Sequence, residues 1–304
     1  MADFGPKTLV DSSKPLDVSS LAGKSVVVTG GAMGIGEAMV RAFVSAGAFV
    51  TFGDINKTVA QQLVANLGGG INACYVPCDV TVWSDQLSLF KTALIESPSK
   101  SIDIVVANAG IAVTDDVFHQ LPLESTEDPK EPQLKTLRTN LIGVAYTVKL
   151  AGHYLPRQSK KQDRSLIMVA SLAGYLDQPG EPQYCASKWG VRGLMHSLRP
   201  TSPPQGFRVN IIAPWFIATN IVSEGMRKQL EEAGLQFAAA EDAAKATLRF
   251  ASDASLNGRS VAIVPRDENP NGYFDLELDD LDEYSALGKM MKKFLALRVK
   301  MQPK

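Results

Sequence analysis

The feature that most constrains the fold of this chain is the stretch of residues 25–54. A β-branched run, Ser25-Val-Val-Val-Thr29, leads directly into Gly30-Gly-Ala-Met-Gly34-Ile-Gly36. A helical pattern follows over 37–46, and a second apolar run over 48–53 ends at Asp54. The order of strand, glycine-rich turn, helix, strand and acidic residue predicts a βαβ unit that binds a dinucleotide.

The glycines and the acid of this unit have separate roles. Gly30, Gly34 and Gly36 let the backbone approach a pyrophosphate, which the first N–H groups of the following helix bind. The Asp54 carboxylate can accept hydrogen bonds from the ribose hydroxyls, and it repels the 2′-phosphate of NADP. NADP enzymes usually carry a basic residue just before the second glycine or just after the acidic position, and here these positions hold Met33 and Ile55. We therefore expect NAD as cofactor, with NADP as the less favoured alternative.

The rest of the chain continues the alternation of strands and helices. Further strands are expected at 73–76, 102–107, 165–170, 207–212 and 260–264. Helical periodicity from Pro129 to Leu155 predicts a long helix with proline near its start. This predicts one Rossmann-type α/β domain, a doubly wound, seven-stranded parallel sheet with helices on both faces. We assign 1–20 to an N-terminal arm, 21–265 to a dinucleotide-binding catalytic domain and 266–304 to a C-terminal tail.

Polar or turn residues follow most of these strands. Ligands of doubly wound sheets bind at the carboxyl ends of the strands, so such residues are expected to converge at one edge. They are Gly34, Asp54, Asp79, Asn108, Ser171 and Pro214.

A second pattern indicates proton-transfer chemistry. Tyr184 and Lys188 are four residues apart, which places them on one face of a helix, and Ser171 ends an apolar run upstream. A lysine cation beside a tyrosine lowers the phenol pKa from about 10, towards values useful for general acid–base catalysis. The alternative is an ordinary Tyr–Lys pair on a helix face.

Several motifs in order make residues 21–265 resemble the short-chain dehydrogenase/reductase family. The glycine turn has the spacing T-G-x-x-x-G-x-G, and Ala107-Asn108-Ala109-Gly110 resembles the family's N-N-A-G element with its first Asn replaced. Cys78-Asp79-Val80 resembles the element that contacts adenine. Pro214 to Thr219 resembles P-G-x-x-x-T, with Trp215 in place of the glycine, which puts the geometry of that loop in question.

The resemblance implies a mechanism and a set of site residues. Tyr184 exchanges a proton with the substrate oxygen, Ser171 orients that oxygen, Lys188 holds the nicotinamide ribose and lowers the Tyr184 pKa, and Asn140 supports a water relay. The implied catalytic residues are Asn140, Ser171, Tyr184 and Lys188. The implied cofactor-binding residues are Gly30, Gly34, Ile35, Gly36, Asp54, Asp79, Val80, Asn108, Ala109, Gly110, Tyr184, Lys188, Pro214, Ile217 and Thr219.

A finer resemblance concerns the substrate. The chain resembles the hydroxyprostaglandin-dehydrogenase-like branch of the family in Tyr184-Cys185-Ala-Ser-Lys188, in the turn Ala254-Ser-Leu-Asn257-Gly258 and in Tyr273-Phe-Asp275. It resembles fungal members that act on polyketide alcohols in Ala213-Pro214-Trp215-Phe216. This implies NAD-linked oxidation of a secondary alcohol on a fairly large apolar substrate, of polyketide or terpenoid type. One alternative is an NADPH-dependent ketoreductase of secondary metabolism. Another is a catalytically silent cofactor-binding scaffold, which the intact catalytic residues disfavour.

Composition excludes several other classes of protein. A formal net charge of −1 gives no basic surface for nucleic acid. Three cysteines and scattered histidines suggest neither a disulfide framework nor a metal site. No apolar run is long enough to span a membrane and no signal sequence is evident, so we expect a cytoplasmic protein. The family resemblance implies a homodimer or homotetramer.

The C-terminal tail separates its charges. Residues 275–283 contain six acids, and residues 289–300 contain five bases interleaved with apolar side chains. A basic amphipathic segment can lie on a membrane surface. We expect instead that the tail packs on its own or a neighbouring subunit, with its acids and bases partly offsetting one another, and we expect no membrane contact.

Overall fold

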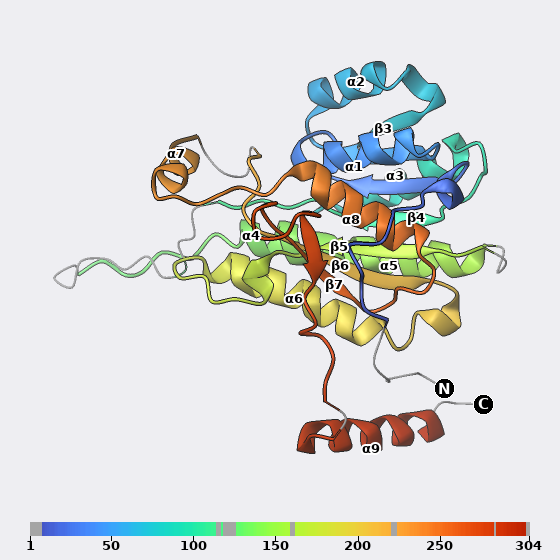
Figure 1. Ribbon diagram of the computed structural model, residues 1–304. Coiled ribbons are helices and arrows are strands. Elements are labelled where there is room, and N and C mark those ends of the chain that lie inside the picture. The colour runs from blue at the N-terminus through green and yellow to red at the C-terminus, as the bar shows by residue number, and fades with distance from the viewer. Residues whose placement is uncertain are drawn as a thin grey trace.

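A computed structural model of the chain describes residues 8–113, 117, 126–158, 162–219, 224–282 and 284–301. It is a three-layer α/β structure in which one twisted sheet lies between two groups of helices (Figure 1). α1 and α8 pack together on one face, and α3, α5 and α6 cover the other. The predicted Rossmann-type architecture is confirmed.

The sheet has the strand order β3-β2-β1-β4-β5-β6-β7-β8 among the described residues. The first seven strands are parallel, as expected. All of them except the edge strand β3 are buried along their whole length, as is usual for parallel strands covered by helices on both faces. An eighth strand pairs antiparallel with β7, which the sequence did not predict. The bounds are β1 Ser25–Thr29, β2 Phe49–Asp54, β3 Ala73–Pro77, β4 Ile104–Ala107, β5 Ser165–Val169, β6 Arg208–Pro214, β7 Ser260–Ile263 and β8 Tyr273–Asp275.

The helices follow the expected alternation, with one difference at a boundary. The long helix expected to start at Pro129 begins at Lys135, because Pro129 and Pro132 disfavour helical backbone in the residues before them. The bounds are α1 Gly34–Ser45, α2 Lys57–Asn66, α3 Trp83–Glu96, α4 Lys135–Leu137, α5 Val144–Tyr154, α6 Pro182–Leu198, α7 Glu224–Glu232, α8 Ala240–Ser252 and α9 Ala286–Met301. A π-helical turn, Arg138–Gly143, joins α4 to α5.

Alternate residues of each strand enter opposite sides of the core. Val26 and Val28 of β1 belong to the cluster under α1 and α8, whereas Val27 belongs to the cluster under α3, α5 and α6. This two-sided burial fixes the register of the sheet, since a shift of one residue would exchange the two sets. Because these strands pair in parallel, the carboxyl ends of β1, β2, β4, β5 and β6 lie at one edge of the sheet.

The N-terminal arm and the strand after β7 are joined at the β8 edge of the sheet. Val10 is buried, and its backbone N–H donates to the Asp275 carboxylate of β8 at 2.9 Å. The fold therefore continues past residue 265. α9 lies apart from the sheet and its helices in Figure 1, and its Leu287, Met290 and Phe294 side chains are exposed. Among the described helices, none has the length and apolar character needed to cross a membrane.

Candidate active site

The glycine turn after β1 has a backbone that only glycine accommodates easily. Gly30 and Gly34 have φ values of 65° and 59°, in the left-handed region. A Cβ atom on Gly36 would lie 1.9 Å from the Gly30 carbonyl oxygen and 2.7 Å from Asn108 Nδ2. The turn is therefore compact, with no room for a side chain at Gly36.

The N-terminus of α1 has the features needed to bind a pyrophosphate. Its N-cap residue is Met33, which makes no side-chain capping hydrogen bond. The first N–H groups of a helix lack intrahelical acceptors and lie at the positive end of the helix dipole. Gly34 and Ile35 occupy this first turn, so the residues present fit the phosphate part of a dinucleotide.

Asp54 lies at the end of β2 beside the glycine turn. Its side chain is 7% exposed, and its two carboxylate oxygens accept hydrogen bonds from the backbone N–H groups of Ala32 at 3.0 Å and Asn56 at 2.9 Å. Each carboxylate oxygen can accept more than one hydrogen bond. The carboxylate is thus fixed in direction and keeps acceptor capacity for the hydroxyls of a ribose.

Asn108 ties the end of β4 to the glycine turn. Its Nδ2 donates to the carbonyl oxygens of Thr29 and Gly30 at 3.0 and 2.9 Å. The Thr29 hydroxyl accepts the backbone N–H groups of Asn108 and Ala109 at 3.1 and 3.2 Å. Sequence reasoning gave Thr29 no role of its own, although it stands first in the glycine motif.

Asn140 lies in the π-helical turn and is fully buried. Its side-chain amide pairs with the backbone of Ile111 in both directions, each at 2.8 Å. An ideal Cβ on Gly110 would lie 3.3 Å from Asn140 Oδ1 and 3.6 Å from Lys188 Nζ, so these polar groups flank the segment after β4. π-helical turns are frequent at functional sites.

The π-helical turn is held by a residue that the sequence did not single out. The Gln86 side chain donates to the carbonyl oxygens of Val80 and Gly143 at 2.7 and 2.8 Å, and accepts from the Thr147 hydroxyl at 2.7 Å. Gln86 is fully buried, so these bonds join the loop after β3 to the helix that carries Asn140. A lone Gln in an amphipathic helix gives no sequence signal for such a role.

Ser171, Tyr184 and Lys188 come together at the carboxyl end of β5. The Ser171 hydroxyl is hydrogen-bonded to the Tyr184 phenol and lies 3.3 Å from the Pro214 carbonyl oxygen. Lys188 Nζ donates to the Val169 carbonyl oxygen at 3.2 Å and lies 5.4 Å from the centroid of the Tyr184 ring. The expected trio is therefore one cluster.

The pKa of Tyr184 departs from the sequence expectation. Burial raises the pKa of its phenol, the Ser171 hydrogen bond opposes that shift, and the nearby Glu181 adds to it. Burial also lowers the pKa of the Lys188 ammonium to about 8, so that lysine remains mostly cationic near neutral pH. The prediction that Lys188 leaves Tyr184 with a lowered pKa is wrong for this arrangement, because desolvation of the phenol outweighs the favourable contacts.

The loop after β6 places Trp215 without backbone strain. In the described chain the only non-glycine residues with positive φ are Lys100 and Glu277, so Trp215 adopts an ordinary conformation. The backbone N–H of Trp215 donates to the Ile263 carbonyl oxygen at 2.8 Å. Its ring packs edge to face on Phe216, with 5.0 Å between the ring centroids. The missing glycine therefore does not distort this loop.

The remaining expected cofactor residues differ in their exposure. Thr219 lies beside the glycine turn, since a Cβ on Gly34 would be 3.0 Å from its methyl carbon. The Ile217 side chain is buried in the core, so only its backbone is available to a ligand. Asp79 is exposed and its carboxylate accepts from the Thr81 N–H at 2.9 Å, whereas Val80 is buried.

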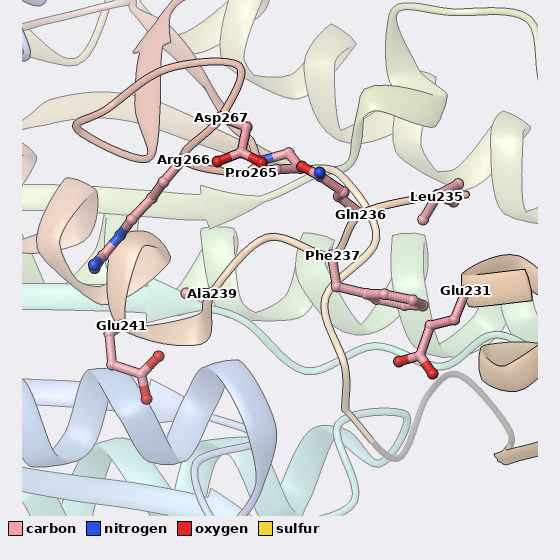
Figure 2. A pocket seen from close by; sticks show the side chains of 9 residues that line it. All are labelled: Glu231, Leu235, Gln236, Phe237, Ala239, Glu241, Pro265, Arg266 and Asp267. Atoms are coloured by element: carbon pink, nitrogen blue, oxygen red, sulfur yellow. The ribbon is translucent and has the colours of Figure 1, made fainter.

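A hollow of about 760 Å³ lies next to this loop. Figure 2 shows that it is bounded by α7, the start of α8 and the segment after β7. Phe237, which lines the hollow, packs edge to face on Phe216, with 6.5 Å between the ring centroids. This contact connects the hollow to the loop that carries Trp215. None of the four expected catalytic side chains lines it, so the hollow does not contain the catalytic cluster.

Comparisons with known proteins agree with this geometry. Residues 24–230 match the family model described as short chain dehydrogenase. A 5'-hydroxyaverantin dehydrogenase of Dothistroma septosporum is 37% identical over 286 residues, covering 88% of this chain and 91% of that protein. A 5'-hydroxyaverantin dehydrogenase of Emericella nidulans is 34% identical over 288 residues, covering 88% and 90%. An NADP-dependent dehydrogenase of Phoma sp. is 31% identical over 303 residues, covering 92% and 86%.

A solved structure supports the fold. The crystal structure of a 3-ketoacyl-(acyl-carrier-protein) reductase from Brucella melitensis, complexed with NADH, superposes with a TM-score of 0.70. It covers 80% of this chain and 97% of that one at 24% identity. The motif order, the clustered side chains and the family match lead to one assignment. This chain belongs to the short chain dehydrogenase family and is an oxidoreductase that acts on CH–OH groups.

Proposed function

We propose that this protein is an NAD-dependent dehydrogenase that oxidises a secondary alcohol on a fairly large apolar molecule of fungal secondary metabolism. The observation that carries the proposal is the cluster of Asn140, Ser171, Tyr184 and Lys188 at the edge that also holds Asp54 and the glycine turn. The names of the two 5'-hydroxyaverantin dehydrogenases support oxidation of a hydroxyl substrate.

The side chains of the cluster supply proton transfer and orientation. Ser171 holds the substrate oxygen by its hydroxyl, and Tyr184 accepts the hydroxyl proton as general base. Lys188 binds the nicotinamide ribose and stabilises the phenolate by its charge, while Asn140 fixes the backbone beside Lys188. Bound NAD supplies the hydride acceptor and a positive charge that favours the phenolate.

The aromatic side chains of the loop after β6 support an apolar substrate. Trp215 and Phe216 form one edge-to-face pair, and Phe216 and Phe237 form another. Aromatic rings contribute large apolar contact areas. The two pairs lead from Pro214, which contacts Ser171, towards the hollow of Figure 2.

The choice of cofactor is tested by fluorescence titration with NADH and NADPH. We expect tighter binding of NADH, because the fixed Asp54 carboxylate repels a 2′-phosphate. Asp54→Asn should reduce this preference by weakening NADH binding and improving NADPH binding. Preference of the wild-type chain for NADPH would contradict the proposal and favour the ketoreductase alternative. The name of the Phoma relative supports use of NADP, although it describes a dehydrogenase.

Turnover is tested with a panel of secondary alcohols and Tyr184→Phe. We expect this variant to lose about 10²- to 10⁴-fold in kcat while it still binds NADH, because the general base is missing and the cofactor contacts remain. Full activity of Tyr184→Phe would refute the mechanism. Absence of turnover in the wild-type chain, with NADH bound, would favour a silent cofactor-binding scaffold.

We also propose that the protein is a homodimer or homotetramer formed through α5 and α6. The support is that both segments expose a large apolar side chain: Ile142 in the π-helical turn before α5 is 45% exposed, and Trp189 on α6 is 49% exposed. Burying such side chains against another subunit would be favourable. Light scattering after size-exclusion chromatography tests this proposal. A monomer would refute it, and Trp189→Lys should shift an oligomer towards monomer.

A further inference from the structure

Asp279, in the acidic segment after β8, is buried against the catalytic helix. Its side chain is 2% exposed. Its Oδ1 accepts from Arg192 Nε at 2.8 Å and lies 3.0 Å from His196 Nε2, both on α6. These contacts hold the pKa of Asp279 down at about 2, against the opposing effect of burial. Asp279 is therefore an anion over the whole working pH range.

The same carboxylate reaches the turn that follows Ser171. Asp279 Oδ2 lies 3.5 Å from the Tyr175 hydroxyl. The Arg192 guanidinium lies over the Tyr175 ring at 4.3 Å from its centroid and donates to the Leu278 carbonyl oxygen at 2.6 Å. A flat guanidinium can stack on a ring and donate sideways at once, which a lysine ammonium cannot do. Asp279, Arg192 and Tyr175 thus form one contact group.

Tyr175 is bonded directly to the catalytic serine turn. Ser171 is the N-cap of the 3₁₀ turn η5, Leu172–Gly174, and its hydroxyl accepts the Ala173 N–H at 3.2 Å. The Tyr175 N–H donates to the Leu172 carbonyl oxygen at 2.9 Å. A Cβ on Gly174 would lie 3.0 Å from the Lys188 carbonyl oxygen, so the turn packs on α6 at the catalytic lysine.

We propose that Asp279 is a positioning residue, which holds the Ser171 turn against α6 so that Ser171 stays hydrogen-bonded to Tyr184. The carboxylate acts through Arg192 and Tyr175 and does not contact the reacting atoms. The catalytic effect of this positioning rests on the proposed function. The contact between Ser171 and Tyr184 does not depend on the proposed function and can be measured without turnover.

The proposal has a consequence for the ionisation of Tyr184. Burial raises the Tyr184 pKa, the Ser171 hydrogen bond lowers it, and Glu181 and Cys185 raise it further. The Lys188 cation lies over the Tyr184 ring. If the turn shifts enough to break the Ser171 hydrogen bond while the phenol stays buried, the contribution of Ser171 is lost and the phenol pKa rises further. The proton acceptor is then available only at higher pH.

Asp279→Asn tests this role, because it removes the charge and keeps the shape. The matched control is Asp280→Asn, which makes the same change one residue later. Asp280 also pairs with arginines, Arg199 at 3.3 Å and Arg259, but these lie at the end of α6 and at β7. Arg192→Lys is a second variant, since lysine keeps the charge and loses the stacked, two-sided contact.

The first measurement is ultraviolet titration of the Tyr184 phenolate in the full chain, obtained as the difference from Tyr184→Phe in each background. We expect Asp279→Asn and Arg192→Lys to raise the Tyr184 pKa, while Asp280→Asn titrates like the wild type. An unchanged titration in folded Asp279→Asn refutes the proposal. If Asp279→Asn does not fold, an unchanged titration in Arg192→Lys refutes it.

The second measurement is alcohol oxidation as a function of pH. We expect kcat of Asp279→Asn to fall about 10- to 100-fold, with its rise displaced to higher pH and NADH affinity retained. A fall in kcat that is equal at all pH values would mean a merely structural role and would refute the proposal. If the wild-type chain has no turnover while the phenolate shift is present, the proposed function fails and the positioning role stands.

Discussion

The ion pair between Arg259 and Asp275 gives a sharp prediction about stability. Arg259 directly precedes β7, and its side chain is 1% exposed. Its Nε donates to Asp275 Oδ2 at 2.9 Å, and its two terminal nitrogens donate to Asp275 Oδ1 and Asp280. Asp275 also accepts the backbone N–H groups of Val10 and Glu277, each at 2.9 Å. One carboxylate therefore joins β7, β8 and the N-terminal arm.

Asp275→Ala removes all of these acceptors at once. It leaves a buried guanidinium with Asp280, whose side chain is 31% exposed, as its remaining partner. Removing one member of a buried pair costs about 3–5 kcal/mol of unfolding free energy. At roughly 2–4 °C per kcal/mol, the expected fall in Tm is roughly 6–20 °C. Arg259→Met should cost less, because the two backbone N–H groups still satisfy the carboxylate that remains.

Urea unfolding and thermal scans measure both variants. The control is Glu232→Ala, which breaks the ion pair between Lys228 and Glu232 at 3.9 Å. The two side chains are 77% and 67% exposed, so this variant should change the unfolding free energy by less than about 0.5 kcal/mol. A loss for Asp275→Ala no larger than that of the control would refute the reasoning. So would a larger loss for Arg259→Met than for Asp275→Ala.

Three further predictions concern the site. Burial lowers the Lys188 pKa from 10.5 to about 8, so between these pH values the unfolded chain binds one more proton than the folded chain. The unfolding free energy should therefore rise with pH in this range, by at most about 3 kcal/mol. Lys188→Met should remove that rise in urea unfolding measured from about pH 7 to 10. Gly36→Ala should abolish NADH binding in fluorescence titration, because its Cβ meets the Gly30 carbonyl oxygen, whereas Gly70→Ala, where a Cβ meets nothing within 4 Å, should bind normally. Trp215→Gly should raise KM for ring-bearing alcohols in steady-state assays with unchanged NADH affinity, and an unchanged KM would exclude Trp215 from substrate binding.

Most of the fold could be predicted because its signals are local. The parallel strands are short runs rich in apolar residues, and the glycine turn requires glycine at fixed positions. β8 was missed because it has three residues, too few to show a pattern of burial. The start of the helix before Asn140 was misplaced because helical periodicity continues through residues 129–134, where the prolines prevent a helix.

The contacts of the acidic segment could not be predicted, because charge segregation does not identify partners. The sequence suggested that the acids of the tail are offset by its own bases. The structure instead pairs Asp279 with Arg192 and Asp275 with Arg259, both in the main domain. Such pairs join residues far apart in the chain, and only the fold brings them together. The direction of the Tyr184 pKa was missed for a similar reason, since burial depends on tertiary packing.

The antiparallel strand β8 has a consequence for how the protein behaves at high concentration. A long parallel edge strand would offer unpaired N–H and C=O groups to any passing extended chain. β8 is only three residues long, and the N-terminal arm approaches it through the hydrogen bond from Val10 to Asp275. At the opposite edge, β3 ends in Pro77, which has no N–H to donate. Short and blocked edges disfavour growth of the sheet from molecule to molecule, so concentrated solutions should resist β-type aggregation.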